Sequence, residues 1–207
     1  MEVCIPGFCS IKYLLSFDPG GSDATWAFSL SCLRHLPYNQ KTFAVLEAGK
    51  VPVLEDLAKP DFSRIEKFYR SLDEKWNFKE NGCQLVAERF VGRGITGKLS
   101  EYIPFALGAW SYIWREHGFG DVSLIMAAQW KRPLSKLNEN YNLEGFTNWW
   151  EHYFHSWLPV REQQNKKYGV HIQDACAIGW WAWTVQRKTW ADDYQLSLPD
   201  VFSNKVT

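Results

Sequence analysis

The sequence predicts an α/β fold in which helices flank a mixed sheet that begins with an antiparallel meander. Segments 11–17, 25–32 and 42–48 are short and rich in β-branched and aromatic residues, and a turn at 37–40 joins the second segment to the third. Farther along the chain, helical periodicities alternate with short apolar runs, which is typical of layered α/β domains. We therefore expect three antiparallel strands followed by alternating helices and strands.

Local patterns place the elements of the first half. Segment 11–17 is an apolar run that ends in Asp18-Pro-Gly-Gly, the pattern of a buried strand that enters a tight turn. Segment 61–76 has apolar residues at helical spacing behind an aspartate that can cap the helix. A short strand at 83–87 ends at Glu88 and precedes a loop with three glycines.

The second half reads as helices around one further strand. A long helix is expected at 98–117, where Gly108 and Ala109 permit close packing, and a strand at 122–126. A short helix begins near Lys131. The remaining elements are expected in this order: a polar loop at 138–145, a helix at 146–157, a basic loop at 159–169 and a final helix at 171–188.

Length and composition predict one domain, residues 1–207, with a core at about 11–188 and a loosely held tail at 191–207. The formal net charge of zero excludes a protein that coats nucleic acid by bulk charge, but it is compatible with an acidic site inside a basic rim. The five cysteines include no CxxC pair, and neither a signal region nor a bilayer-length apolar stretch is found. These features predict a cytoplasmic protein without a membrane partner.

The twelve tryptophans are unusually many and partly clustered, at 149–150 and 180–183. Such clusters indicate an interface or a binding surface, with burial in the core as the alternative.

Three acidic residues are candidates for a metal-dependent site. Asp18 and Glu88 end predicted strands, and Asp174 opens the last predicted helix beside an apolar stripe. Strand ends and helix starts meet at one edge of an α/β sheet, and hydrolysis of a phosphodiester by two metal ions needs such clustered carboxylates. The alternative is structural: Asp18 shapes its turn, Glu88 pairs with a neighbouring arginine, and Asp174 supports the helix N-terminus.

Four segments resemble, in order, the motifs of the RuvC Holliday-junction resolvases of the RNase H-like superfamily. They are Leu-Ser-Phe-Asp18-Pro-Gly-Gly, Leu-Val-Ala-Glu88-Arg-Phe, Ala-Ala-Gln-Trp-Lys131 and His171-Ile-Gln-Asp174-Ala-Cys-Ala-Ile. The resemblance spans about 11–188 and implies an RNase H-like fold and a homodimer that makes paired nicks in branched DNA such as four-way junctions. The small, divergent chain would suit a virus-encoded member.

The resemblance also implies roles for these residues. Two Mg²⁺ ions, for which Mn²⁺ substitutes, would be held by Asp18, Glu88, Asp174 and His171, and Lys131 would lie near the scissile phosphate. His171 stands where the family has an acidic residue, and it would act as a ligand or a base.

Basic residues group beside these motifs and are the expected DNA contacts, together with one aromatic residue that would stack at the opened junction. They are Arg89, Phe90, Arg93, Lys98, Lys131, Arg132, Lys136, Lys166 and Lys167. Two alternatives stay open: another RNase H-like DNA nuclease, of terminase or flap-cutting type, and a degenerate RNase H-fold module that binds nucleic acid on its tryptophans.

Overall fold

The computed structural model describes residues 11–19, 25–35, 41–55, 59–89, 98–120, 122–136, 148–158 and 166–183. Within these ranges the main sheet has five strands, in the order β3-β2-β1-β6-β7. The antiparallel strands are β1 (Tyr13–Asp18), β2 (Thr25–His35) and β3 (Lys41–Pro52), and the strands parallel to β1 are β6 (Cys83–Glu88) and β7 (Val122–Ile125). The predicted mixed sheet with an N-terminal meander is confirmed.

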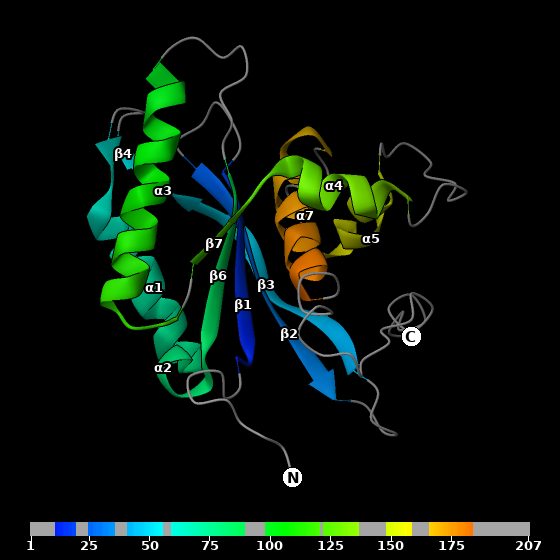
Figure 1. The fold of residues 1–207 in the computed structure, drawn as a ribbon, viewed down its shortest axis with the longest axis horizontal. Helices are drawn as coiled ribbons and strands as arrows, with labels where there is room; N and C mark the ends of the chain where they lie inside the picture. The colour runs from blue at the N-terminus through cyan, green and yellow to red at the C-terminus, as the bar shows by residue number, and fades with distance from the viewer. Residues whose placement is uncertain are drawn as a thin grey trace.

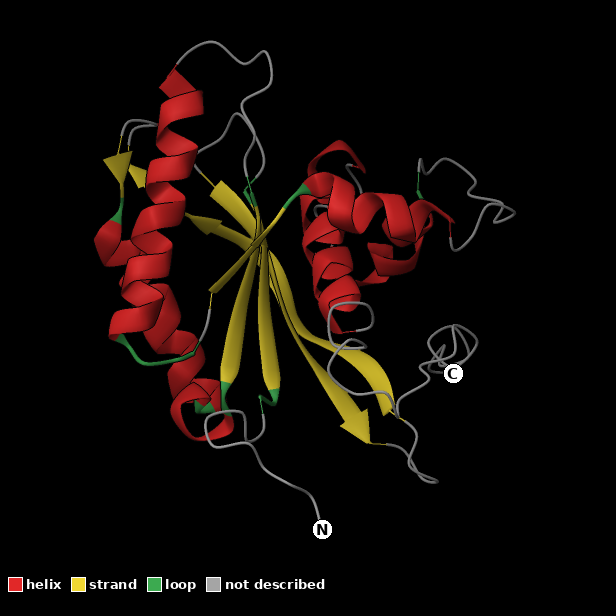
Figure 2. Cartoon of the chain, viewed as in Figure 1, coloured by secondary structure: helices red, strands yellow, loops and turns green. Residues whose placement is uncertain are grey.

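Helices cover both faces of this sheet (Figures 1 and 2). One face carries α1 (Phe62–Trp76), α2 (Phe78–Asn81) and α3 (Lys98–Glu116), and the other carries α4 (Ala127–Lys136), α5 (Trp149–Tyr153) and α7 (Lys166–Trp181). A 3-10 helix, Phe154–Trp157, follows α5, and a small separate hairpin joins β4 (Leu54–Glu55) to β5 (Lys59–Pro60). The result is a three-layer α/β/α arrangement.

The alternation of side chains along β1 divides the interior into two cores. Leu15 and Phe17 belong to the core under α1 and α3, whereas Leu14 belongs to the core under α4, α5 and α7. Ser16 and Asp18 share the face of Leu14 because side chains alternate along a strand. The first candidate acid therefore points toward α7.

The tryptophan clusters are mostly core residues, and the predicted binding surface is wrong for four of them. Trp150, Trp180, Trp181 and Trp183 are all buried in the second core, where they pack against α4, α7 and the sheet. Burial of so large an apolar area outweighs the cost of placing an indole N–H inside. These side chains cannot serve as a stacking platform on the surface.

Helix α7 sits unusually close to β1. The Ser16 hydroxyl donates a hydrogen bond to the Ala175 carbonyl at 2.7 Å. A Cβ atom on Gly179 would lie 2.9 Å from Ser16 Oγ and 3.2 Å from Ser31 Oγ, so this position accepts only glycine without displacement. The buried serines and Gly179 thus fix the height of α7 over the sheet.

Two helices begin earlier than predicted. α7 begins at Lys166, so the predicted basic loop is wrong over 166–169, and His171 and Asp174 lie in the middle of the helix rather than at its start. Gly169 is buried, and its packing outweighs its weak helix propensity. α4 begins at Ala127, where the Gln129 side chain accepts a hydrogen bond from the Met126 N–H at 2.7 Å and closes the first turn.

Other predictions differ in smaller ways. The helix expected at 146–157 is divided into α5 and the 3-10 helix. Gly108 is exposed with no atom near its Cβ position, so the close packing expected there is wrong, and only Ala109 is buried. The turn 37–40, the glycine loop after residue 89, the loop 138–145 and the tail 191–207 lie outside the described residues.

The Asp61 cap of α1 is confirmed, because its carboxylate accepts a hydrogen bond from the Arg64 N–H at 3.0 Å. None of the helices in the described ranges combines the length and apolarity needed to cross a bilayer.

Candidate active site

Two of the predicted acids end neighbouring parallel strands. β1 and β6 pair in register from Tyr13 and Cys83 onward, so that Asp18 and Glu88 are the last residues of adjacent strands. Glu88 in turn pairs with Ile125, the last residue of β7, and α4 begins two residues later. The carboxyl ends of all three strands therefore lie at one edge of the sheet, where open α/β sheets bind their ligands.

Helix α7 brings two more predicted residues to this edge. His171 and Asp174 are one helical turn apart and so lie on the same face. His171 Nδ1 lies 2.6 Å from Asp18 Oδ2, which joins the middle of α7 to the end of β1. The Lys131 ammonium, from α4, donates to Asp174 Oδ2 at 3.0 Å. The five residues predicted for the catalytic site are thus brought together.

Two tryptophans complete the contacts of the carboxylates. Trp130 Nε1 donates to Glu88 Oε2 at 2.8 Å, and Trp150 Nε1 donates to Asp174 Oδ1 at 2.8 Å. Trp130 belongs to the Ala-Ala-Gln-Trp-Lys131 motif, but no role was predicted for it. Trp150 belongs to a tryptophan cluster that was expected at an interface or a binding surface. Neither contact has a local sequence signal, because the partners are 42 and 24 residues apart.

The carboxyl groups are buried close enough to disturb one another. Burial and the charge of Asp18 raise the pKa of Glu88 from 4.5 to about 7, although the Trp130 hydrogen bond acts in the opposite direction. Burial and the charge of Asp18 also raise the pKa of Asp174 from 3.8 to about 6, despite the nearby ammonium of Lys131. Burial and the neighbouring negative charge therefore both disfavour the ionised form of these two carboxyl groups.

The two cationic groups respond to that charge. The hydrogen bond to Asp18 raises the pKa of His171, and burial opposes the shift without cancelling it. Burial lowers the pKa of Lys131, but the carboxylates of Asp174, Glu88 and Asp18 together outweigh burial and the net pKa is raised. Lys131 therefore carries its charge, and His171 is more readily protonated than an ordinary histidine.

Lys50 lies on the other flank of the site, and no sequence pattern indicates it. Asp18 pairs with Ala27 on β2, and Ala27 pairs with Lys50 on β3, so the three form one row across the sheet. The charge of Lys50 lowers the pKa of His171, which places its ammonium within electrostatic range of the imidazole. Only strand register reveals this neighbour.

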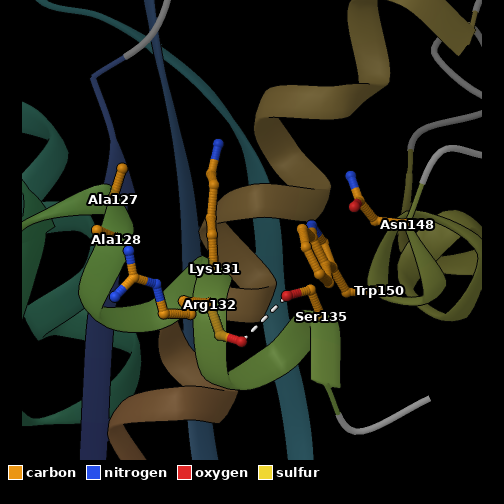
Figure 3. A pocket seen from close by; sticks show the side chains of 7 residues that line it. All are labelled: Ala127, Ala128, Lys131, Arg132, Ser135, Asn148 and Trp150. Carbon is orange, nitrogen blue, oxygen red and sulfur yellow. Dashed lines mark hydrogen bonds between the residues drawn. The ribbon is translucent and has the colours of Figure 1, made fainter. Parts of the chain in front are cut away.

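An open cavity of about 380 Å³ adjoins the site on the α4 side (Figure 3). Its lining includes two cations, Lys131 and Arg132, and reaches Trp150 across the space between α4 and α5. The other lining residues are Ala127, Ala128, Ser135 and Asn148. Lys131 and Trp150 both hydrogen-bond to Asp174, so the cavity and the carboxylates share a wall.

The predicted DNA contacts are only partly described. Lys131 and Arg132 line the cavity, and Arg89 is exposed directly after Glu88. Phe90 and Arg93 lie outside the described residues, as do the side chains of Lys98, Lys136, Lys166 and Lys167.

The structural alternative is wrong for Asp174, and for Asp18 and Glu88 it depends on the turn 20–24 and on Arg93, which lie outside the described residues. Asp18 contacts His171, Glu88 accepts from Trp130, and Asp174 lies in mid-helix, where it cannot support a helix N-terminus. Within the described ranges, no three histidine, cysteine, aspartate or glutamate side chains converge as a ready-made metal cage.

A Thermus thermophilus RuvC structure in complex with a Holliday junction substrate is similar to this chain, with a TM-score of 0.51 and 15% sequence identity. The match covers 81% of this chain and 90% of that chain. The fold is RuvC-like. Another Thermus thermophilus RuvC structure is similar with a TM-score of 0.48 and 15% identity, and the match again covers 81% of this chain and 90% of that chain. The yeast mitochondrial Holliday junction resolvase has a TM-score of 0.45 and 15% identity, and the match covers 86% of this chain and 81% of that chain.

No protein-family model and no curated protein sequence matches this chain. The RuvC-like fold is therefore carried by the arrangement of strands and helices at a level of sequence identity that leaves activity to be argued from the site.

Proposed function

We propose that this protein is a metal-dependent DNA endonuclease that cleaves branched DNA, four-way junctions foremost. The observation that carries the proposal is the meeting of Asp18, Glu88 and Asp174, from three separate elements, at one edge of the sheet. Lys131 stands beside them and an open cationic cavity adjoins them. Phosphodiester hydrolysis needs this combination of acidic ligands and a cation for the phosphate.

The residues fit a magnesium site. Hard cations prefer oxygen ligands, and a divalent ion would offset both causes that raise the pKa of Glu88 and Asp174, which are burial first and the charge of Asp18 second. Mg²⁺ is commonly bound through one or two carboxylates with water and substrate phosphate, so a cage made only of protein side chains is not required. Asp18, Glu88 and Asp174, with His171 beside them, would hold the two ions, and Mn²⁺ would substitute for Mg²⁺.

The bound ions would supply an activated water and stabilise the leaving oxygen. The side chains around them have separate tasks. Lys131 would attract the scissile phosphate and offset its charge in the transition state. His171 would orient Asp18 through its 2.6 Å contact and serve as a ligand or a base when unprotonated.

The cationic residues outline a path for the substrate strand. Lys131 and Arg132 line the cavity on one side of the carboxylates, and Lys50 lies on the other side. A DNA backbone that runs between these cations, across the ends of β1 and β6, would place one phosphate over the carboxylates. Because the net charge of the chain is zero, selectivity for branched DNA would come from shape and from this local charge.

A homodimer would suit a four-way junction, since two symmetric sites meet two symmetric strands. One neighbour of this chain is described as RuvC in complex with a Holliday junction substrate, which supports a junction as the substrate. A general RNase H-like DNA nuclease is the second candidate, because the same site would hydrolyse other DNA. Among the described residues, the burial of Trp150, Trp180, Trp181 and Trp183 removes much of the support for a binding module. Cytoplasmic location and a viral source stay predictions.

The decisive test compares labelled junction, flap, single-stranded and linear DNA at fixed salt with Mg²⁺. Paired symmetric nicks in the junction, with linear duplex spared, are expected. Equal cutting of all four substrates would contradict junction selectivity and leave the general nuclease.

The site itself is tested by Asp18→Asn, Glu88→Gln and Asp174→Asn, each of which deletes a charge and almost no volume. Each variant should lose cleavage while it keeps junction binding in a gel-shift assay. If two of the three retain near wild-type rates, the shared carboxylate site is refuted.

A further inference from the structure

We infer that the buried indoles of Trp130 and Trp150 are positioning residues that hold Glu88 and Asp174 for metal binding. The inference rests on the proposed function and adds to it two residues that belong to none of the acidic motifs. Each indole N–H donates to one carboxylate oxygen, at 2.8 Å in both cases. The indoles come from different elements, α4 and α5, and serve acids from different elements, β6 and α7.

The two indoles form one packed unit. Trp130 is 0% exposed and Trp150 is 2% exposed. Their ring centroids lie 5.6 Å apart with the planes at 67°, an edge-to-face pair. Because each ring is locked in the second core and against the other, neither N–H is able to turn away from its carboxylate.

A buried indole N–H usually has a hydrogen-bond acceptor in a folded protein, whatever its function. In this chain, however, burial alone does not guarantee an acceptor. Within the described residues, the indole N–H groups of Trp110 and Trp114 are buried and have no hydrogen-bond acceptor. Trp183 donates to the Ser31 hydroxyl. The partly buried Trp76 also donates to a carboxylate, Glu47 Oε1 at 2.6 Å, away from the site. Trp130 and Trp150 differ from it because they are fully buried and because the carboxylates they hold belong to the candidate site.

A neutral donor suits this task better than a cation. An indole N–H fixes the orientation of a carboxylate and leaves its full negative charge in place, whereas an ammonium or imidazolium competes with an incoming metal ion. A residue that hydrogen-bonds to a metal ligand, without contacting the metal itself, orients that ligand. Removal of such a residue commonly lowers metal affinity by roughly 10–100-fold. Trp130 and Trp150 meet this description, and Lys131 and His171 do not.

The first experiment measures Mn²⁺ binding without DNA, from the electron paramagnetic resonance signal of the free ion. Trp130→Phe and Trp150→Phe delete the N–H and keep most of the ring. Each should raise the dissociation constant for Mn²⁺ by roughly 10–100-fold. Trp114→Phe is the matched control, since it makes the same change in the other core where no carboxylate is contacted, and its affinity should equal that of the wild type. Thermal unfolding of each variant verifies that it is folded.

The second experiment leaves both tryptophans in place. In protein labelled with ¹⁵N-tryptophan, the indole cross-peaks of Trp130 and Trp150 are assigned from the phenylalanine variants. Glu88→Gln should move the Trp130 cross-peak, and Asp174→Asn should move the Trp150 cross-peak, because each changes the acceptor of one bond. A spectrum in which neither substitution moves any indole cross-peak would overturn the inference, and because that result needs no assignment, it holds even if a phenylalanine variant fails to fold.

The outcomes separate this inference from the proposed function. Mn²⁺ affinity that depends on the two indoles, in a protein that cuts no DNA, would support the inference and refute the nuclease. DNA cleavage with unchanged Mn²⁺ affinity in both variants would refute the inference alone. A wild-type protein that binds no Mn²⁺ would refute both.

Discussion

Glu88→Gln is expected to stabilise the metal-free protein at alkaline pH while it abolishes cleavage. Burial and the charge of Asp18 raise the pKa of Glu88 from 4.5 to about 7, so the folded protein holds this proton more tightly than the unfolded chain does. As pH rises from 4.5 to about 7, the unfolded chain loses its proton first, and the free energy of unfolding falls. At about 1.36 kcal/mol per pH unit the loss is about 3 kcal/mol, which solvent screening at this half-buried group reduces to about 1–3 kcal/mol.

The glutamine variant removes the charge and keeps an acceptor for the Trp130 N–H. Thermal unfolding is measured in chelator at pH 5 and pH 8. At pH 8 the variant should melt about 2–12 °C above the wild type, given roughly 2–4 °C per kcal/mol for a chain of this size, and at pH 5 most of that difference should vanish. Glu74→Gln, on the exposed side of α1, should show no such dependence. A variant that is no more stable than the wild type at pH 8, or equally stabilised at both pH values, would refute the reasoning.

Three further predictions concern charge and packing. Lys131→Ala should lower the cleavage rate by about 10²–10³-fold, measured in single-turnover assays with saturating Mg²⁺, because it removes the cation that we propose offsets charge on the phosphate; an effect on stability alone would contradict this. The hydrogen bond to Asp18 raises the pKa of His171 above 6.5, so the acid limb of the pH–rate profile should lie above 6.5 and flatten in His171→Asp. The His171–Asp18 pair contributes its full stabilisation of the folded protein below pH 6.5, and this contribution is lost as pH rises through the raised pKa of His171. Melting curves of the wild type and of His171→Ala, compared across pH, would show the loss. Gly179→Ala should destabilise the protein by about 1–3 kcal/mol through overpacking, whereas Gly108→Ala on the open face of α3 should be neutral or stabilising.

The sequence predicted the strands of the main sheet well because their signals are local. The run that ends at Asp18 and the strand that ends at Glu88 have the apolar content of buried strands and end at the predicted residues. Helix starts were less predictable. The segment before His171 contains lysines and a glycine and reads as a loop, yet α7 covers it because Gly169 is buried against the rest of the fold.

The candidate site was predicted as a set of residues but not as a set of contacts. Ordered motifs indicated Asp18, Glu88, Lys131, His171 and Asp174, and the structure brings them together. The residues that hold them were not predictable, because their partners are distant in the chain. Trp150 looked like a surface aromatic, and Lys50 has no motif around it and reaches the site only through strand register.

The geometry of the site depends on packing as much as on the acids themselves. Asp18 and Glu88 are fixed by the pairing of β1 with β6, but Asp174 and His171 are carried by α7, and their distance from the strand ends is set by how closely α7 approaches the sheet. That approach is possible because Ser16 bonds the Ala175 carbonyl and Gly179 has no side chain to keep the helix away. A shift of α7 away from the sheet by about 1 Å would stretch the 2.6 Å contact between His171 and Asp18 beyond hydrogen-bond distance, whereas the apolar contacts of the core weaken gradually over the same shift. Cleavage should therefore be more sensitive than folding to changes at Ser16 and Gly179, although both act through the position of α7 and not on the carboxylates themselves.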